Sequence, residues 1–375
     1  MDLVQRKSNF ELMRIFAIFL IVIFHASMDL NQSMNFQHVF TPNMIPIFLL
    51  GGWGRLGVGL FVIVSSWYLQ EKEFDPKRGK KFIYICYITV YYAFLVPFIM
   101  KLTHLREVSI SDFLKALLSP FINSYWYVSS YLMLLVFYPI INKCIKALSY
   151  QELKYTTVAM LIISDIWSIL ALSRVAQVTG EFMTFLTLYF LVACMKRKPD
   201  NWFMKKSGMK AVLMYFLIIG ICVFTEILGT YFNIHFLISI AVRILNNNSI
   251  FIDFFAILIF CVFFKMNIKY NVVLNTIAKT TLGVYVLHTT SAFSCDGWDR
   301  FFFLGRSFLE DSVMIFTLRL VASAGLVFVI GVVLDLIRIY AIDSWLFSIK
   351  PISLLIEKWN SILNYNLSDK KKEKL

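Results

Sequence analysis

The chain has 375 residues, of which 59% are hydrophobic and 16% are charged, and its net charge is +13. Soluble domains average about 45–50% apolar and about 25% charged residues, so a single soluble core cannot bury this much apolar surface. The composition therefore predicts an integral membrane protein. The basic residues lie in short clusters between apolar segments, which favours membrane orientation over a nucleic-acid partner. The six cysteines are scattered without a CxxC pair, and we expect no metal site.

The apolar segments predict an all-α bundle of about ten transmembrane helices, because a spanning helix needs roughly 20 apolar residues. The predicted spans are 10–28, 46–69, 82–100, 125–141, 156–173, 180–195, 210–232, 249–264, 273–294 and 312–340. With a cytoplasmic N-terminus, the cytoplasmic segments, counted with the cytoplasmic ends of the adjoining spans, hold 26 Lys and Arg, and the external loops hold 7. This bias predicts that the N- and C-termini are both cytoplasmic.

Two smaller helices are predicted outside the spans. The sequence SISDFLKALLSP at 109–120 is typical of a short capped helix at the outer interface. Residues 345–363 place apolar side chains at helical spacing and predict an amphipathic helix on the inner membrane surface. A basic tail follows, and anionic lipid attracts such tails. We therefore expect a multi-span membrane domain over 1–343, and an interfacial helix with a basic tail over 344–375.

The first span carries three ionisable residues, Glu11, Arg14 and His25. Eleven residues make almost three helical turns, so Arg14 and His25 share one stripe, with Glu11 one turn before Arg14. A charge that faces lipid costs a few kcal/mol, so this stripe must face the bundle interior or a wet cavity. Arg14 alone can snorkel, and His25 alone can brace two helices. Their shared face favours a functional role.

The second span is rich in glycine and contains Arg55. Its glycines are Gly51, Gly52, Gly54, Gly57 and Gly59. They predict either close helix approach or a broken segment with exposed backbone. Arg55 is then either an interfacial packing residue or a cation that faces an anionic ligand.

Basic and aromatic residues provide further candidates. The basic cluster after the second span consists of Lys77, Arg78, Lys80 and Lys81. Such a cluster fixes topology or binds the phosphates of an anionic donor. Trp126 opens the fourth span and suits either an aromatic belt or a substrate contact. Tyr285 and His288 lie one turn apart in the ninth span, and His288 is predicted at a depth near that of His25.

Together these motifs resemble the acyltransferase-3 family of bacterial integral-membrane acyltransferases. The resemblance covers nearly the whole chain and rests, in order, on RKSNFELMRIFAIFLIVIFHA, GRLGVGLFVIVSSWYL, KRGKKF, YWYVSSYLMLLVFYPIIN and LGVYVLH. Its most specific element, an Arg and a His separated by ten residues, falls on Arg14 and His25, which the resemblance implies are active-site residues. The chain has Ser65-Ser66 where family members usually have Ser-Gly.

The resemblance implies transfer of an acyl group, commonly acetyl, from acyl-coenzyme A to a hydroxyl of an envelope carbohydrate. We therefore expect acetyl-CoA as the donor, and an envelope or capsular polysaccharide or its lipid-linked precursor as the acceptor. The expected location is the bacterial cytoplasmic membrane, where polysaccharide-assembly proteins are candidate partners. The alternative is a polysaccharide exporter, flippase or other multi-span transporter without transferase activity.

The predicted site has three groups of residues. The predicted catalytic residues are His25, Arg14 and Glu11, the predicted donor-binding residues are Arg55, Lys77, Arg78, Lys80 and Lys81, and the predicted acceptor-binding residues are Trp126, Tyr285 and His288. His25 can act as a general base toward an acceptor hydroxyl, or it can become acylated and relay the group. We favour direct transfer with His25 as the base because it needs fewer steps.

Overall fold

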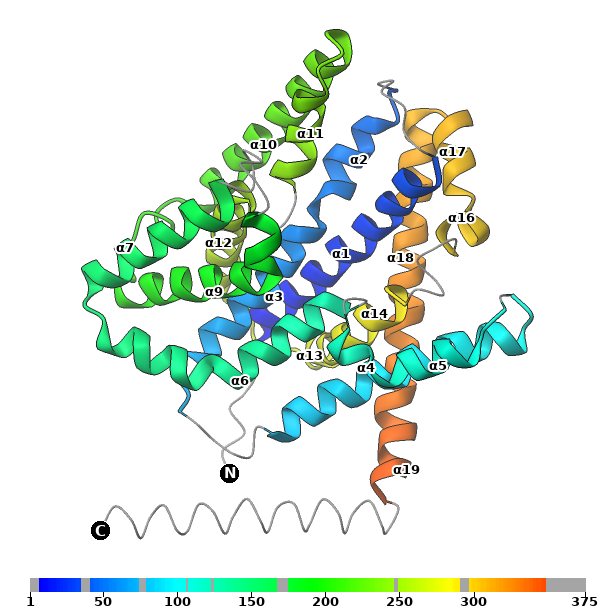
Figure 1. Ribbon diagram of the computed structural model, residues 1–375, viewed down its shortest axis with the longest axis horizontal. Coiled ribbons are helices and arrows are strands. Elements are labelled where there is room, and N and C mark those ends of the chain that lie inside the picture. Colours follow the sequence, from blue (N-terminus) through cyan, green and yellow to red (C-terminus); the bar gives the residue numbers. More distant parts are fainter. Residues whose placement is uncertain are drawn as a thin grey trace.

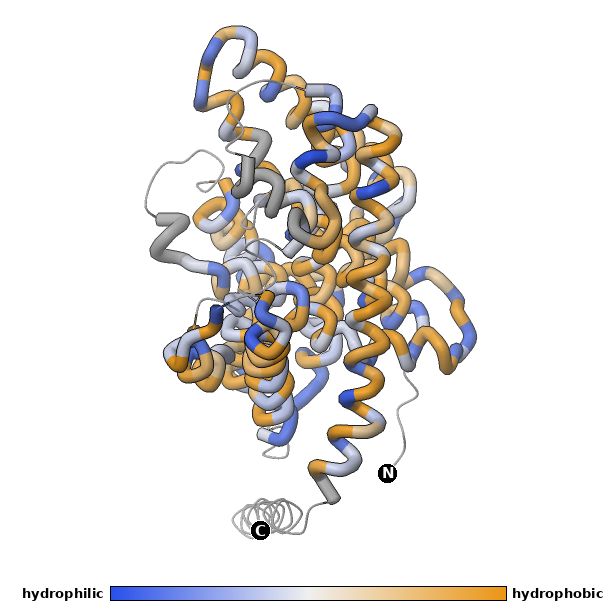
Figure 2. The backbone as a smooth tube through the Cα atoms, turned by 90° about the vertical axis from the view of Figure 1, so that its right-hand side faces the viewer, coloured by the Kyte–Doolittle hydropathy of each residue, from blue (hydrophilic) through white to orange (hydrophobic). Residues whose placement is uncertain are grey.

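The computed structural model in Figure 1 describes residues 7–34, 41–73, 79–105, 107–122, 125–166, 175–245, 249–290 and 297–348. Within these ranges the regular secondary structure is helical and includes no strand. The helices are predominantly apolar along their length, and Figure 2 shows hydrophilic residues gathered mainly at the turns between them. The predicted all-α class is therefore confirmed.

The helices of the first half are α1 (Ser8–Met34), α2 (Met44–Leu50), η1 (Gly51–Trp53), α3 (Gly54–Leu69), α4 (Gly79–Leu102), α5 (Ile110–Leu117), η3 (Ser119–Phe121), α6 (Trp126–Ala147), α7 (Tyr150–Leu161) and the π-helix η5 (Ile162–Ile166). Those of the second half are α9 (Val175–Arg197), α10 (Ser207–Tyr231), α11 (His235–Ile244), α12 (Ile250–Lys265), α13 (Val272–Lys279), α14 (Thr281–His288), α16 (Gly297–Phe302), α17 (Leu304–Glu310), α18 (Val313–Ile337), the π-helix η6 (Arg338–Ile342) and α19 (Asp343–Ser348).

Six helical stretches of the described chain are long and apolar enough to cross a membrane. They are Ser8–Ser27, Met44–Leu69, Gly79–Leu102, Trp126–Ala147, Ser207–Tyr231 and Val313–Leu346. Each coincides with a predicted span, and a hydrocarbon core about 30 Å thick needs helices of this length. The protein is therefore a multi-pass helical membrane protein.

The other four predicted spans fall on shorter or interrupted helices. The span 249–264 coincides with α12, which has 16 residues, and 180–195 lies in α9, whose backbone leaves helical geometry at Gly180. The span 273–294 contains α13 and α14, and 156–173 reaches into 167–174, outside the described residues. The count of ten spans and the cytoplasmic placement of both ends stay predictions.

Helix α1 lies in the middle of the bundle. It packs against α3, α12, α13, α14 and α18, and Figure 1 shows α1 and α3 side by side between α18 and α12. The apolar side of α1 is fully buried at residues such as Met13, Ala17 and Ile18. Covering α1 with protein on several sides removes its ionisable residues from lipid.

The glycines of the second span produce both predicted effects. The span breaks at η1, where a short 3-10 turn separates α2 from α3. Beyond the break, a Cβ at Gly57 would lie 2.4 Å from the carbonyl oxygen of Ala17, and one at Gly54 would lie 2.3 Å from the ring of Phe24. Only glycine allows α3 to approach α1 this closely.

A buried ion cluster joins α4 to α18. The Arg338 guanidinium donates to Asp335 (Nε–Oδ1, 2.7 Å) and to Asp343 (Nη1–Oδ2, 2.7 Å), and Arg338 and Asp335 are almost fully buried. Tyr92 of α4 donates to Asp335 at 2.8 Å, and Tyr87 donates to Asp343 at 2.8 Å. Buried charges persist where partners satisfy them, so this cluster holds α4 against α18 and the helical turns that follow it.

The two predicted interfacial helices differ in what the structure describes. Helix α5 begins with a capping box formed by Ser109 and Asp112, and the sequence predicts this capped helix. Of the helix predicted at 345–363, only the first residues lie in α19, and residues 349–375 fall outside the described residues. The boundary predicted at 343 falls in the continuous helical stretch formed by α18, η6 and α19.

We predict that Gly57→Ala lowers the free energy of unfolding by about 1–3 kcal/mol, because the new methyl group meets backbone that cannot rotate away. Thermal unfolding of the purified protein in detergent measures the change. Gly220→Ala is the matched control, since a Cβ there meets nothing within 4 Å. Equal melting temperatures for the two variants would contradict the proposed α1–α3 contact.

Candidate active site

The N-terminal part of the α1 stripe is an ion pair. Arg14 Nη1 lies 3.0 Å from Glu11 Oε1 and 3.1 Å from Oε2, while the Glu11 side chain is 5% exposed and that of Arg14 is 26% exposed. The pair follows from the i, i+3 spacing, which places the two side chains on one face. Glu11 thus compensates and orients a guanidinium that remains partly accessible.

Arg14 faces a cavity of about 280 Å³ formed by residues of α1, α3, α4, α6, α13 and α14. Its lining residues are Arg14, Ile21, Phe61, Ser65, Lys81, Tyr84, Ile85, Ile88, Tyr127, Tyr131, Ala278, Lys279, Thr281, Leu282 and Tyr285. The wall is mostly apolar and aromatic with a few convergent polar groups, which is the usual composition of a small-molecule site.

Among the described residues that line this cavity, three are cations, namely Arg14, Lys81 and Lys279. Lys81 donates from Nζ to the Tyr131 hydroxyl at 2.7 Å, and its Nζ lies 5.1 Å from the centroid of the Tyr131 ring. Cations gathered around one cavity favour an anionic ligand, because their mutual repulsion falls when an anion binds. The cavity therefore suits a molecule with an anionic end and a narrow apolar or amide-containing arm.

The C-terminal part of the α1 stripe is a contact between two histidines. His25 Nδ1 lies 3.1 Å from His288 Nε2, and the ring centroids are 5.0 Å apart. His25 Nδ1 also lies 2.9 Å from the carbonyl oxygen of Ile21, and His288 Nδ1 lies 2.6 Å from that of Val284. The structure thus pairs the two membrane histidines that the sequence predicts at similar depth.

Aromatic residues connect the cavity with the histidine pair. Tyr285 lines the cavity, and its ring centroid lies 6.1 Å from that of His288 and 5.3 Å from that of Tyr127. Ile21, whose carbonyl contacts His25, is also part of the cavity wall. The pair therefore lies directly behind the cavity wall formed by Ile21 and Tyr285.

Arg55 lies near the histidine pair rather than at the cavity. Its guanidinium carbon is 4.8 Å from the centroid of the Trp126 ring and 5.8 Å from that of Phe24. The Phe24 ring in turn makes an edge contact with His25 at 5.4 Å. Arg55 Nε is buried and has no hydrogen-bond partner among the described residues. This leaves a desolvated donor available for a ligand.

The predicted site residues therefore form two groups. Arg14, Lys81 and Tyr285 line the cavity, with Glu11 behind Arg14, whereas His25, His288, Arg55 and Trp126 gather beyond its wall. Lys80 is exposed and outside the cavity lining, and Lys77 and Arg78 lie outside the described residues. Among the described residues, no group of three or more His, Cys, Asp or Glu is arranged to hold a metal ion.

Sequence reasoning did not assign Ser65, Tyr127, Tyr131 and Lys279, which the structure adds to the cavity. Tyr127 and Tyr131 are four residues apart, so the i, i+4 rule places both on one face of α6. Lys279 ends α13 beside two threonines, which resembles an ordinary helix terminus. Its role depends on the break between α13 and α14, which the sequence pattern of one continuous span does not indicate.

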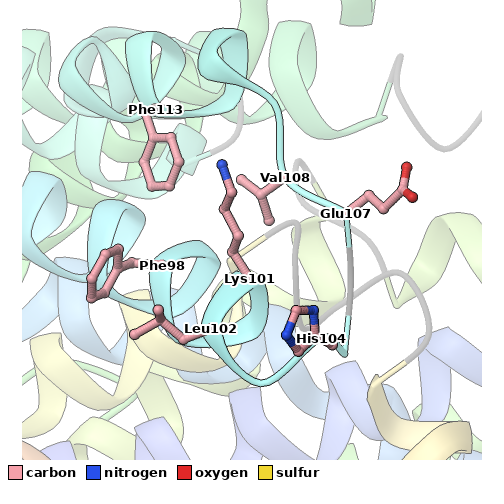
Figure 3. A pocket seen from close by; sticks show the side chains of 7 residues that line it. All are labelled: Phe98, Lys101, Leu102, His104, Glu107, Val108 and Phe113. Atoms are coloured by element: carbon pink, nitrogen blue, oxygen red, sulfur yellow. The ribbon is translucent and has the colours of Figure 1, made fainter.

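A second cavity of about 860 Å³ lies between the end of α4 and α5 (Figure 3). Lys101 extends between Phe113 and Val108, and its Nζ lies 5.9 Å from the Phe113 ring centroid. His104 and Glu107 belong to the connecting turn. None of the predicted site residues lines this second cavity, so it is separate from the α1 stripe.

Apolar helices of spanning length surround a polar stripe and a cation-lined cavity, and ionisable residues in such a position are typical of a functional site in a membrane protein. The family model described as an acyltransferase domain matches residues 7–338, and the chain belongs to the acyltransferase-3 family. The protein is thus a membrane acyltransferase. No match was found among curated proteins or among solved structures.

The neighbouring residues Ser65 and Ser66 differ in their access to the cavity and therefore provide a test of its position. In a variant whose six native cysteines are replaced, we predict that Ser65→Cys reacts with a small water-soluble thiol reagent, because Ser65 lines the cavity. Ser66→Cys should stay unmodified, because Ser66 is fully buried. Mass spectrometry measures both modifications. Faster modification at position 66 than at position 65 would contradict the cavity geometry.

Proposed function

We propose that the protein transfers an acetyl group from acetyl-coenzyme A to a hydroxyl of an envelope or capsular polysaccharide, or of its lipid-linked precursor, in the bacterial cytoplasmic membrane. Family membership supports the reaction class. The observation that carries the proposal is a cavity lined by three cations, with a histidine pair behind its wall. Ile21, a residue of that wall, contacts His25 of the pair. Transport alone does not require a histidine pair next to a cavity lined by cations.

The donor would enter from the basic side of the cavity. Phosphates of coenzyme A would bind Lys81, Lys279 and Arg14, because charge-assisted hydrogen bonds to phosphate are strong and guanidinium binds it with two parallel donors. Lys80 is exposed next to Lys81 in the chain and would add positive charge outside the cavity lining. A volume of about 280 Å³ suits the acylated pantetheine arm better than the whole donor, so the nucleotide would lie at the mouth.

The acceptor would reach the histidine pair from the other side, past Arg55 and Trp126. The unpartnered Arg55 Nε supplies a donor for a sugar oxygen or for the oxyanion that forms during transfer. Trp126 gives this entrance a flat aromatic face, and it also orients the guanidinium above it. We therefore propose that Arg55 binds the acceptor, whereas the sequence predicts that it binds the donor.

The proposed reaction is a direct transfer. His25 accepts the proton of the acceptor hydroxyl while the hydroxyl oxygen attacks the thioester carbonyl carbon. The resulting oxyanion then collapses, the carbon–sulfur bond breaks, and the proton on His25 passes to the departing sulfur. The products are the acetyl ester and coenzyme A with a free thiol. One imidazole therefore serves as general base and then as general acid.

We predict that His25→Ala reduces acetyl transfer by at least about 100-fold, because the change removes the imidazole that takes the hydroxyl proton. The assay uses purified protein, labelled acetyl-coenzyme A and an envelope glycan acceptor. His235→Ala is the matched control at an exposed histidine of α11. If the His25 variant is monodisperse in detergent and still acetylates the glycan, His25 is not the base.

We also predict that Lys81→Gln and Lys279→Gln each raise the donor KM by about 10-fold, because each change removes one charge from the phosphate site. Lys143→Gln, at an exposed position of α6 outside the cavity lining, should leave the KM unchanged. The difference between variants should shrink at high salt, since salt screens partly exposed charges. Equal effects of all three substitutions would place the donor elsewhere.

A further inference from the structure

The two histidines are arranged so that their backbone contacts determine where each proton lies. Both rings fold back on their own helix: His25 Nδ1 is 2.9 Å from the Ile21 carbonyl oxygen, and His288 Nδ1 is 2.6 Å from the Val284 carbonyl oxygen. Each carbonyl belongs to the residue four positions earlier. The third contact, 3.1 Å, joins His25 Nδ1 to His288 Nε2.

The Val284 contact fixes the tautomer of His288. A carbonyl oxygen only accepts hydrogen bonds, so the 2.6 Å contact requires a proton on His288 Nδ1. A neutral imidazole carries one ring proton, which leaves His288 Nε2 as an acceptor. His288 is fully buried in the bundle, where a second proton and its positive charge would be costly.

The tautomer of His25 then follows. Two acceptors face His25 Nδ1, namely the Ile21 carbonyl oxygen and the bare His288 Nε2. A proton on Nδ1 satisfies both contacts, whereas a lone pair there would face two other lone pairs at 2.9 and 3.1 Å. His25 Nδ1 therefore carries the proton, and His25 Nε2 carries the free lone pair.

We infer that His288 is a positioning residue that holds His25 in the Nδ1–H tautomer, so that Nε2 of His25 is the nitrogen that accepts the substrate proton. This role of His288 in catalysis rests on the function proposed above. When Nε2 takes the hydroxyl proton, the positive charge on His25 is shared with two acceptors already in place. Nε2 then returns that proton to the leaving sulfur, and the pair regains its starting state.

This arrangement gives His25 an orienting partner comparable to the aspartate of a Ser-His-Asp triad, which holds a catalytic imidazole in one tautomer. Here the partner is neutral. A carboxylate at this depth would add a second expensive charge, whereas an imidazole provides a directional acceptor without one. Sequence reasoning assigned His288 to acceptor binding, and the contact with His25 instead directs its Nε2 away from that role.

The tautomer can be measured on the unmodified reaction centre. We would label the protein with [δ1-¹⁵N]histidine, use a background in which His38, His104 and His235 are replaced by glutamine, and record ¹⁵N spectra in detergent. The expected result is a protonated-type Nδ1 signal for both remaining histidines. A bare-type Nδ1 signal for His25, assigned by its loss in His25→Ala, would overturn the inference.

The role of His288 is tested by two substitutions of similar size. His288→Leu removes the acceptor and should lower kcat by about 100-fold while the donor KM stays within about 2-fold, because His288 does not line the donor cavity. His288→Gln supplies an acceptor oxygen near the position of Nε2 and should retain kcat within about 10-fold of the unmodified protein. A kcat for His288→Leu equal to that for His288→Gln would show that the acceptor has no positioning role.

These measurements separate the inference from the proposed function. Absence of acetyl transfer by the unmodified protein would refute the function, while the ¹⁵N spectra would still report the tautomer. A protonated Nε2 on His25 in an active enzyme would refute the positioning role and leave the transferase function intact. The spectra of the unmodified pair also stand if either His288 variant fails to fold.

Discussion

A bilayer accepts a helix that carries Glu11, Arg14 and His25 only when protein covers the face that bears them, because each charge exposed to lipid costs a few kcal/mol. The bundle meets this constraint by packing α3, α12, α13, α14 and α18 around α1. Gly54 and Gly57 allow one of these helices, α3, to approach closely, and the Asp335–Arg338 cluster holds α4 against α18. The cavity and the histidine pair both depend on this enclosure.

The two ends of the α1 stripe have different surroundings and therefore suit different tasks. Arg14 shares its cavity with Lys81 and Lys279, so that end favours an anionic group. His25 lies among rings and a second histidine, an environment of low dielectric that favours a neutral imidazole. Under the proposed function, this separation would keep the phosphates of an anionic donor away from the base.

The sequence predicts the parts of this site that depend on local periodicity. Helical spacing alone places Glu11, Arg14 and His25 on one face, and the glycines of the second span indicate close packing or a break. What it does not predict depends on tertiary structure: the His25–His288 contact spans 263 positions, and Lys279 reaches the cavity because the helix is interrupted after it. The contact between Arg55 and Trp126 is tertiary as well, and no local pattern shows that these two side chains lie together.

In the proposed reaction, the donor occupies the cavity between α1, α4 and α14 and presents its acyl carbon to His25. A cryo-electron microscopy structure with a non-hydrolysable acetyl-coenzyme A analogue tests it most directly. We expect density for the phosphates beside Lys81, Lys279 and Arg14. The acyl end should lie beyond Ile21 and Tyr285, next to His25 Nε2. Density for the analogue in the cavity between α4 and α5, with the Arg14 cavity empty, would contradict it.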